Sequence, residues 1–122
     1  MIMSGLLVVS MLALAKGVAE YTASKEVQLD EQKPCVVIDA GHGGSDPGKV
    51  GINGALEKDI NLSIALKLKQ FLEANDVEVV LTRETEEGLY DADASNKKVQ
   101  DMKRRISIID ETAPLVTVSI HQ

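Results

Sequence analysis

Apolar and polar residues alternate in blocks along residues 34–122, and three of the blocks predict β-strands. Residues 36–39 form a short apolar run without strict alternation, which is typical of a strand covered on both faces. Residues 77–82 (VEVVLT) and 115–120 (LVTVSI) are rich in β-branched residues, which favour strands. The pattern therefore predicts three strands, separated by longer segments.

Two amphipathic segments between these strands predict helices. In the first, apolar residues recur at spacings of three and four, and Asn75 follows as a helix stop. These residues are Ile60, Ile64, Leu68 and Phe71 with Leu72, and Ala65 lies on the same side. In the second helix the apolar residues are Val99, Met102, Ile106 and Ile109.

The order of elements predicts the fold class. Strand, helix, strand, loop, helix and strand follow one another, and Pro114 lies beyond the end of the second helix. This alternation favours an α/β fold of three layers with a mainly parallel sheet and right-handed crossovers. The sequence ends just after the third strand. Residues 83–96 form a polar loop of unusual length, and loops of this size are often functional or mobile.

Composition excludes several classes of partner. The only aromatic residues are Tyr21, Phe71 and Tyr90, so a stacking platform for single-stranded nucleic acid is not expected. The formal net charge is -6, which also argues against broad binding to nucleic acid or to an anionic membrane. The basic runs 97–98 and 103–105 are local exceptions, which we expect to be solvated helix faces.

Cys35 is the only cysteine, so the chain forms no internal disulfide. It opens the first predicted strand and would lie roughly 20 Å from His42 along it. We therefore expect Cys35 to be a small buried hydrophobic residue and not a metal ligand.

The first 33 residues are expected to lie outside the folded domain. Residues 6–15 are hydrophobic except for Ser10, too few to span a membrane, and 13–15 (ALA) match a signal-peptidase cleavage pattern. Residues 1–19 are therefore predicted to be a signal peptide or a membrane anchor that engages the membrane, although no Lys or Arg precedes the apolar run; a buried core helix is the alternative. Residues 20–33 are predicted to be a linker, and residues 34–122 the domain.

His42, Glu57 and His121 are the candidate metal ligands. His42 follows the first strand, His121 follows the third, and Glu57 stands just ahead of the first helix. In open α/β sheets, ligands bind outside the carboxyl ends of the strands, so the topology brings both histidines to one edge. Two imidazoles and one carboxylate, with a fourth position open to water, match a hydrolytic zinc site.

The glycine-dense loop 41–48 around His42 allows tight turns and the close approach of a substrate. Asp39 and Asp46 either orient a histidine or cap a turn. A histidine after a strand is more often a packed residue than a ligand, and the triad has no local signature. The loop also has the first two glycines of a nucleotide-binding GxGxxG motif, but Asp46 replaces the third.

Several motifs resemble those of the zinc-dependent N-acetylmuramoyl-L-alanine amidases. They are 37–48 (VIDAGHGGSDPG), 54–59 (GALEKD), 81–83 (LTR), Arg105 and 119–121 (SIH), in the order that the family has. The resemblance implies that His42, Glu57 and His121 bind one Zn²⁺. It also implies hydrolysis of the peptidoglycan amide between N-acetylmuramic acid and L-alanine. The insertion 89–101 (LYDADASNKKVQD) resembles the branch that acts on spore cortex in sporulation and germination.

The resemblance implies an exported enzyme of the cell envelope or spore cortex, with peptidoglycan as its substrate and with an unidentified activating protein. Relatives continue past the third zinc ligand and carry a late glutamate as general base, for which this sequence offers no candidate. No catalytic residue is therefore assigned, and we expect residues 34–122 alone to be of low stability and nearly inactive. The alternatives are an inactive wall-binding or regulatory fragment that keeps the zinc site, and a structural or nucleotide-binding domain without metal.

Overall fold

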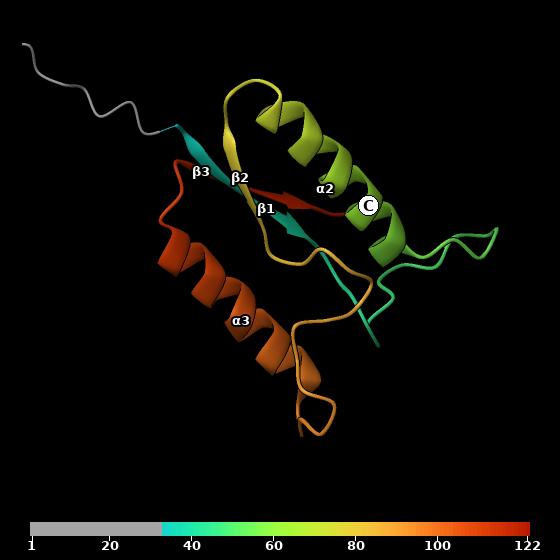
Figure 1. Ribbon diagram of the computed structural model, residues 1–122. Helices are drawn as coiled ribbons and strands as arrows, with labels where there is room; N and C mark the ends of the chain where they lie inside the picture. Colours follow the sequence, from blue (N-terminus) through green and yellow to red (C-terminus); the bar gives the residue numbers. More distant parts are fainter. Residues whose placement is uncertain (1–32) are drawn as a thin grey trace, which may run out of the picture. The chain divides into compact units, whose positions relative to one another are not determined.

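The computed structural model describes residues 33–122, which form one unit of alternating strands and helices (Figure 1). The elements are β1 (Cys35–Ala40), α2 (Glu57–Glu73), β2 (Glu78–Leu81), α3 (Lys97–Thr112) and β3 (Val116–Ile120). Each lies within a residue or two of the predicted range, except that both helices begin earlier. The predicted leader and nearly all of the predicted linker lie outside the described residues. Within 33–122, no helix has the length and apolar character needed to cross a membrane.

The three strands form a parallel sheet with β1 in the centre, in the order β2-β1-β3. Val37 pairs with Val80 on one side and with Thr117 on the other. Figure 1 shows α2 and α3 on opposite faces of this sheet, which is the arrangement that right-handed crossovers on either side of β1 produce. The predicted three-layer α/β fold is therefore confirmed.

The core lies between the sheet and α2. Ile38 and Ala40 of β1 are fully buried, and they pack with Leu62 and Ala65 of α2. The predicted apolar face of this helix was partly wrong, because Ile60 and Ile64 are 40% and 38% exposed. The helix is rotated so that a polar residue, Asn61, faces the core, and the apolar period alone did not allow for this.

The face predicted for α3 was wrong to a greater extent. Val99, Met102 and Ile106 are each about half exposed, and Arg105 is the buried residue of this helix. The expectation that the basic run 103–105 is a solvated face therefore fails at Arg105, whose charge is paired inside the domain.

The third strand forms one edge of the described sheet. Among residues 33–122 it pairs only with β1, and Leu115 and Val116 are 75% and 49% exposed. Cys35, whose carbonyl accepts from the Leu115 N–H, is only partly buried, so the prediction that it is a buried residue is only partly right.

Candidate metal centre

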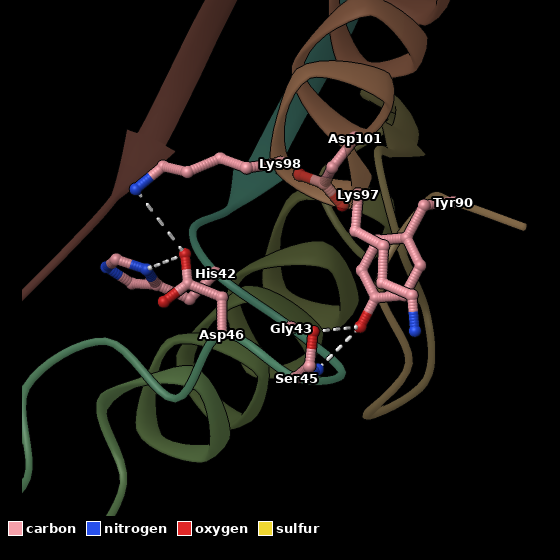
Figure 2. A pocket seen from close by; sticks show the side chains of 8 residues that line it. All are labelled: His42, Gly43, Ser45, Asp46, Tyr90, Lys97, Lys98 and Asp101. Carbon is pink, nitrogen blue, oxygen red and sulfur yellow. Dashed lines mark hydrogen bonds and ion pairs between the residues drawn. The ribbon is translucent and has the colours of Figure 1, made fainter. Parts of the chain in front are cut away.

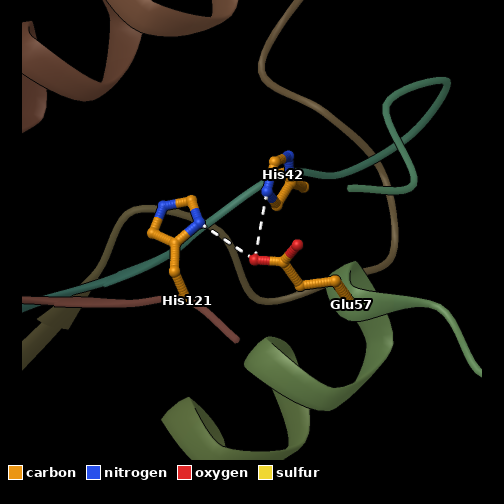
Figure 3. A group of neighbouring side chains, drawn as sticks. All are labelled: His42, Glu57 and His121. Carbon is orange, nitrogen blue, oxygen red and sulfur yellow. Dashed lines mark hydrogen bonds and ion pairs between the residues drawn. The ribbon is translucent and has the colours of Figure 1, made fainter. Parts of the chain in front are cut away.

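The carboxyl ends of β1 and β3 bring the two histidines together. Ala40 pairs with Ile120, and the Gly41 N–H donates to the Ile120 carbonyl at 3.1 Å. His42 and His121 therefore leave the sheet side by side, and their ring centroids lie 4.8 Å apart. Glu57, the first residue of α2, points its carboxylate at both rings (Figure 3).

The three side chains of His42, Glu57 and His121 could hold one metal ion. One ligand atom from each lies within 4.8 Å of the others. Glu57 Oε1 is 3.2 Å from His42 Nε2 and 3.1 Å from His121 Nδ1. Ligand atoms about 2.0–2.1 Å from a tetrahedral zinc ion would be separated by about 3.3 Å, which these distances approach. The sequence-predicted residues are thus brought together.

The tautomer of His42 suits a ligand. Its Nδ1 lies 3.1 Å from Asp46 Oδ2, and an ionised carboxylate can only accept, so Nδ1 carries the proton. In the neutral imidazole, Nε2 then carries the lone pair, and it faces Glu57 Oε1, which is also an acceptor. A metal ion bound between these two atoms would satisfy both of them. Asp46 also accepts from the Gly48 N–H, so it both orients the histidine and caps the turn.

Glu57 is held in its ionised form by hydrogen bonds. The backbone N–H groups of Lys49 and Gln122 donate to its carboxylate at 2.8 and 3.0 Å. These bonds, together with His121 and Asn61, outweigh desolvation and lower the pKa of Glu57 to about 2. The Glu57 side chain is 7% exposed, whereas that of His121 is 52% exposed, so solvent reaches the cluster from the His121 side.

Two glycines leave room for these side chains. A Cβ on Gly41 would collide with the ring of His121. Gly48 has φ +65°, and a Cβ there would lie 2.6 Å from His42 Cδ2 and 2.7 Å from Glu57 Oε2. The glycine loop therefore permits the close approach of the candidate ligand side chains to its backbone.

Two buried arginines fix the backbone of the His42 loop, a role that the sequence reasoning missed. Arg83 donates to the carbonyls of Ala40 and Gly41 at 2.9 and 3.0 Å. Arg105 donates to the carbonyls of Ala40 and His42 at 2.8 and 2.6 Å. Three successive carbonyls are thus bound, which holds His42 at φ +64°, a conformation that side-chain-bearing residues seldom adopt. In the sequence, only the match of both arginines to family motifs indicated that they have a role in the site.

Asp39 does not contact a histidine, contrary to one of the two roles considered for it. Its Oδ1 forms an ion pair with Arg105 at 2.7 Å, and its Oδ2 accepts from Ser119 at 2.8 Å. Burial by itself would raise the pKa of Asp39, but hydrogen bonds from Arg105, Ser119 and Thr82 hold it below its ordinary value. Asp39 therefore supports the site by neutralising the buried arginine.

Asn61 is a second buried polar residue that the sequence did not reveal. It is fully buried one turn after Glu57, and its Nδ2 donates to the Gly41 carbonyl at 3.3 Å. Its Oδ1 has no hydrogen-bond partner among the described residues. Asn61 links α2 to the backbone just before His42, and so ties two of the three candidate ligands together.

A parallel α/β sheet with two histidines and a carboxylate at its carboxyl edge is the arrangement of a candidate metal-binding α/β domain, and comparison with known proteins identifies the family. The sequence profile of N-acetylmuramoyl-L-alanine amidase matches residues 36–122. The chain belongs to this family of peptidoglycan amidases.

Individual relatives agree with the family match. The chain is 33% identical over 89 residues to the germination-specific N-acetylmuramoyl-L-alanine amidase of Bacillus subtilis, covering 70% of this chain and 37% of that protein. It resembles the CwlD amidase of Clostridioides difficile, solved in complex with the GerS lipoprotein, at 38% identity and a TM-score of 0.69, covering 73% and 48%. It also resembles the catalytic domain of CwlV from Bacillus (Paenibacillus) polymyxa, at 39% identity and a TM-score of 0.60, covering 72% of this chain and 44% of that one. The chain thus spans less than half the length of these relatives.

Proposed function

We propose that this domain serves in the zinc-dependent hydrolysis of the amide between N-acetylmuramic acid and L-alanine in peptidoglycan. The observation that carries the proposal is the gathering of His42, Glu57 and His121 within 4.8 Å at the carboxyl edge of the sheet. Membership of the amidase family supplies the substrate class.

Each residue has a role in this proposal. His42 Nε2, His121 and the ionised Glu57 hold the zinc ion, and Asp46 fixes the proton on His42 Nδ1. Zinc, when bound, polarises the amide carbonyl and activates water for the attack. Arg83 and Arg105 act as positioning residues, because they bind the backbone carbonyls that place His42. The general base is not assigned to a described residue.

The proposal extends to the spore branch of the family and to export. It is supported by the identity to a germination-specific amidase of Bacillus subtilis and by the likeness to the CwlD amidase. That amidase is described with the GerS lipoprotein, and an activating protein partner forms part of the proposal here. A signal peptide or anchor in residues 1–19 would deliver the domain to the cell envelope or spore cortex.

The test is zinc content and turnover of the same preparation. We expect about one zinc ion per chain by elemental mass spectrometry, and only slow release of new L-alanine amino groups from purified peptidoglycan, because no described residue is assigned as the general base. Glu57→Gln removes the charge at nearly constant shape and should lose both. Glu73→Gln, a matched control at the exposed end of α2, should keep both.

The outcomes separate the proposal from its rival. Zinc and peptidoglycan binding without amine release would favour a wall-binding fragment that keeps the metal site. Equal zinc content in the wild type and in Glu57→Gln would show that these three residues are not the ligands. Faster release from spore cortex than from vegetative wall would support the spore branch, and equal rates would contradict it.

A further inference from the structure

A pocket of about 250 Å³ adjoins the candidate metal centre (Figure 2). Its walls come from the glycine loop, the loop 83–96 and the first residues of α3. His42 lies on the border, since its side chain lines the pocket and also faces Glu57. A molecule with one end at the metal centre would therefore extend into this pocket.

The loop 83–96 is fastened to the glycine loop and so provides a firm wall. The Tyr90 hydroxyl donates to Ser45 Oγ at 2.9 Å and accepts from the Ser45 N–H. The Gly44 N–H donates to the Glu86 carbonyl at 2.7 Å. The long polar loop noted in the sequence is thus part of the site, and its Tyr90 is one of the pocket residues.

The acidic residues that line the pocket are already paired. Asp101 accepts from Arg105 Nε at 2.6 Å and from the Leu89 N–H at 2.7 Å. Asp46 accepts from His42 and from the Gly48 N–H. Asp101 is thus neutralised by Arg105, whereas Asp46 is held by two hydrogen bonds.

The basic residues of the pocket keep donors to spare. Lys98 reaches across the pocket to within 4.0 Å of Asp46, but its side chain is 80% exposed. The Lys97 ammonium lies 5.4 Å from the centre of the Tyr90 ring, and no carboxylate in residues 33–122 lies within ion-pair distance of it. Both lysines belong to the first turn of α3, but their ammonium groups point to different ends of the pocket, Lys98 toward Asp46 and Lys97 toward Tyr90 (Figure 2).

We propose that Lys97 and Lys98 form a subsite for the free carboxylates of the peptide that follows the scissile amide. The inference rests on the proposed function. With the amide at the metal centre, one side of the substrate is glycan, whose hydroxyl and acetamido groups are uncharged. The other side is a peptide, which carries carboxylates. Only the peptide side offers an anion for two lysines, so the pocket accepts the peptide and orients the substrate.

The expected effect is moderate because both ammonium groups are solvated. An exposed ion pair contributes up to about fivefold in affinity, and two such factors multiply to about 25-fold at most, so we expect about tenfold for the two lysines together. Salt should weaken this preference, since exposed charges are screened.

The experiment compares two ligands by calorimetric titration of the metal-free full chain, in which no cleavage occurs. The ligands are N-acetylmuramoyl-L-alanyl-D-glutamate and its counterpart with both carboxylates converted to amides. We expect the wild type to bind the carboxylate form about tenfold more tightly. The double variant Lys97→Gln with Lys98→Gln should bind both forms alike. Lys103→Gln, on the same helix but outside this pocket, should keep the preference.

Equal affinity of the wild type for the two ligands, or no measurable binding of the carboxylate form, would overturn the subsite. So would a preference that survives in the double variant, whose fold is checked by circular dichroism. Turnover of peptidoglycan by the zinc-loaded chain is read separately. Turnover without the carboxylate preference would contradict the subsite and leave the proposed function standing. The carboxylate preference without turnover would leave the subsite standing and contradict the proposed function.

Discussion

The two helices hold the sheet by different means. α2 buries apolar side chains against it, chiefly Leu62 and Ala65, with Leu68 and Leu72 partly buried beside them. α3 turns Val99, Met102 and Ile106 outward, and its single buried residue is Arg105. One helix is fixed by packing and the other by an ion-paired arginine.

This difference reaches the metal centre. Glu57 is the first residue of the packed helix, so its position follows from the core. His42 is held through its carbonyl by the arginine of the other helix. Packing therefore positions Glu57, and hydrogen bonds position His42. The two contributions can be tested separately.

The largest effect is expected from Arg105→Met. The change keeps much of the side-chain volume but leaves Asp39 and the carbonyls of Ala40 and His42 without their donor. Breaking a buried pair from one side costs about 3–5 kcal/mol. Urea unfolding should show that loss in the free energy of unfolding.

Arg104→Met is the matched control on the same helix. Arg104 is partly exposed and pairs with Asp91, so its loss should cost only about 0–1 kcal/mol. Similar losses in the two variants would mean that the buried pair does not hold α3 to the sheet.

The packed helix should respond next most strongly, to Leu62→Ala. Leu62 is 8% exposed and packs in the core cluster, so its truncation should cost about 2–4 kcal/mol. Ile64→Ala, at a position 38% exposed on the same helix, should cost about 1 kcal/mol or less. If Ile64→Ala were the more damaging, the originally predicted apolar face would be the packed one.

The ion pair of α3 also predicts a dependence on pH. Because the pKa of Asp39 is lowered in the folded chain, its stabilisation is complete above the unfolded value of about 4 and is lost as the pH falls through the folded value. The difference in unfolding free energy between the wild type and Asp39→Asn should therefore be constant above about pH 4 and shrink below it. A difference that grows on acidification would contradict the lowered pKa.

The sequence predicted the strands, the fold class and the convergence of His42, Glu57 and His121, because these depend on apolar runs and on the shared edge of parallel strands. It failed where polar residues are buried. Periodicity treats Asn61 and Arg105 as exposed, and only their contacts with carbonyls of residues far away in the chain explain their burial.

The pocket could not be predicted either. Its wall depends on the contact between Tyr90 in the loop 83–96 and Ser45 in the glycine loop. These residues are 45 positions apart, and neither loop has a periodic pattern. The basic run 97–98 was noted, but a helix face toward solvent and one toward a site have the same sequence pattern. Charge alone did not show which neighbours the lysines would meet.

The smallest effect is expected from Met102→Gln on the outward face of α3. Met102 is 50% exposed, so replacing it with a polar side chain of similar length should change the free energy of unfolding by no more than about 0.5 kcal/mol. A loss above about 1 kcal/mol would mean that this face is covered in solution. Sedimentation of the wild type at several concentrations then decides whether a second copy of the chain covers it. An unchanged stability would leave Arg105 as the main link between α3 and the sheet, and would sharpen the contrast with the packed face of α2.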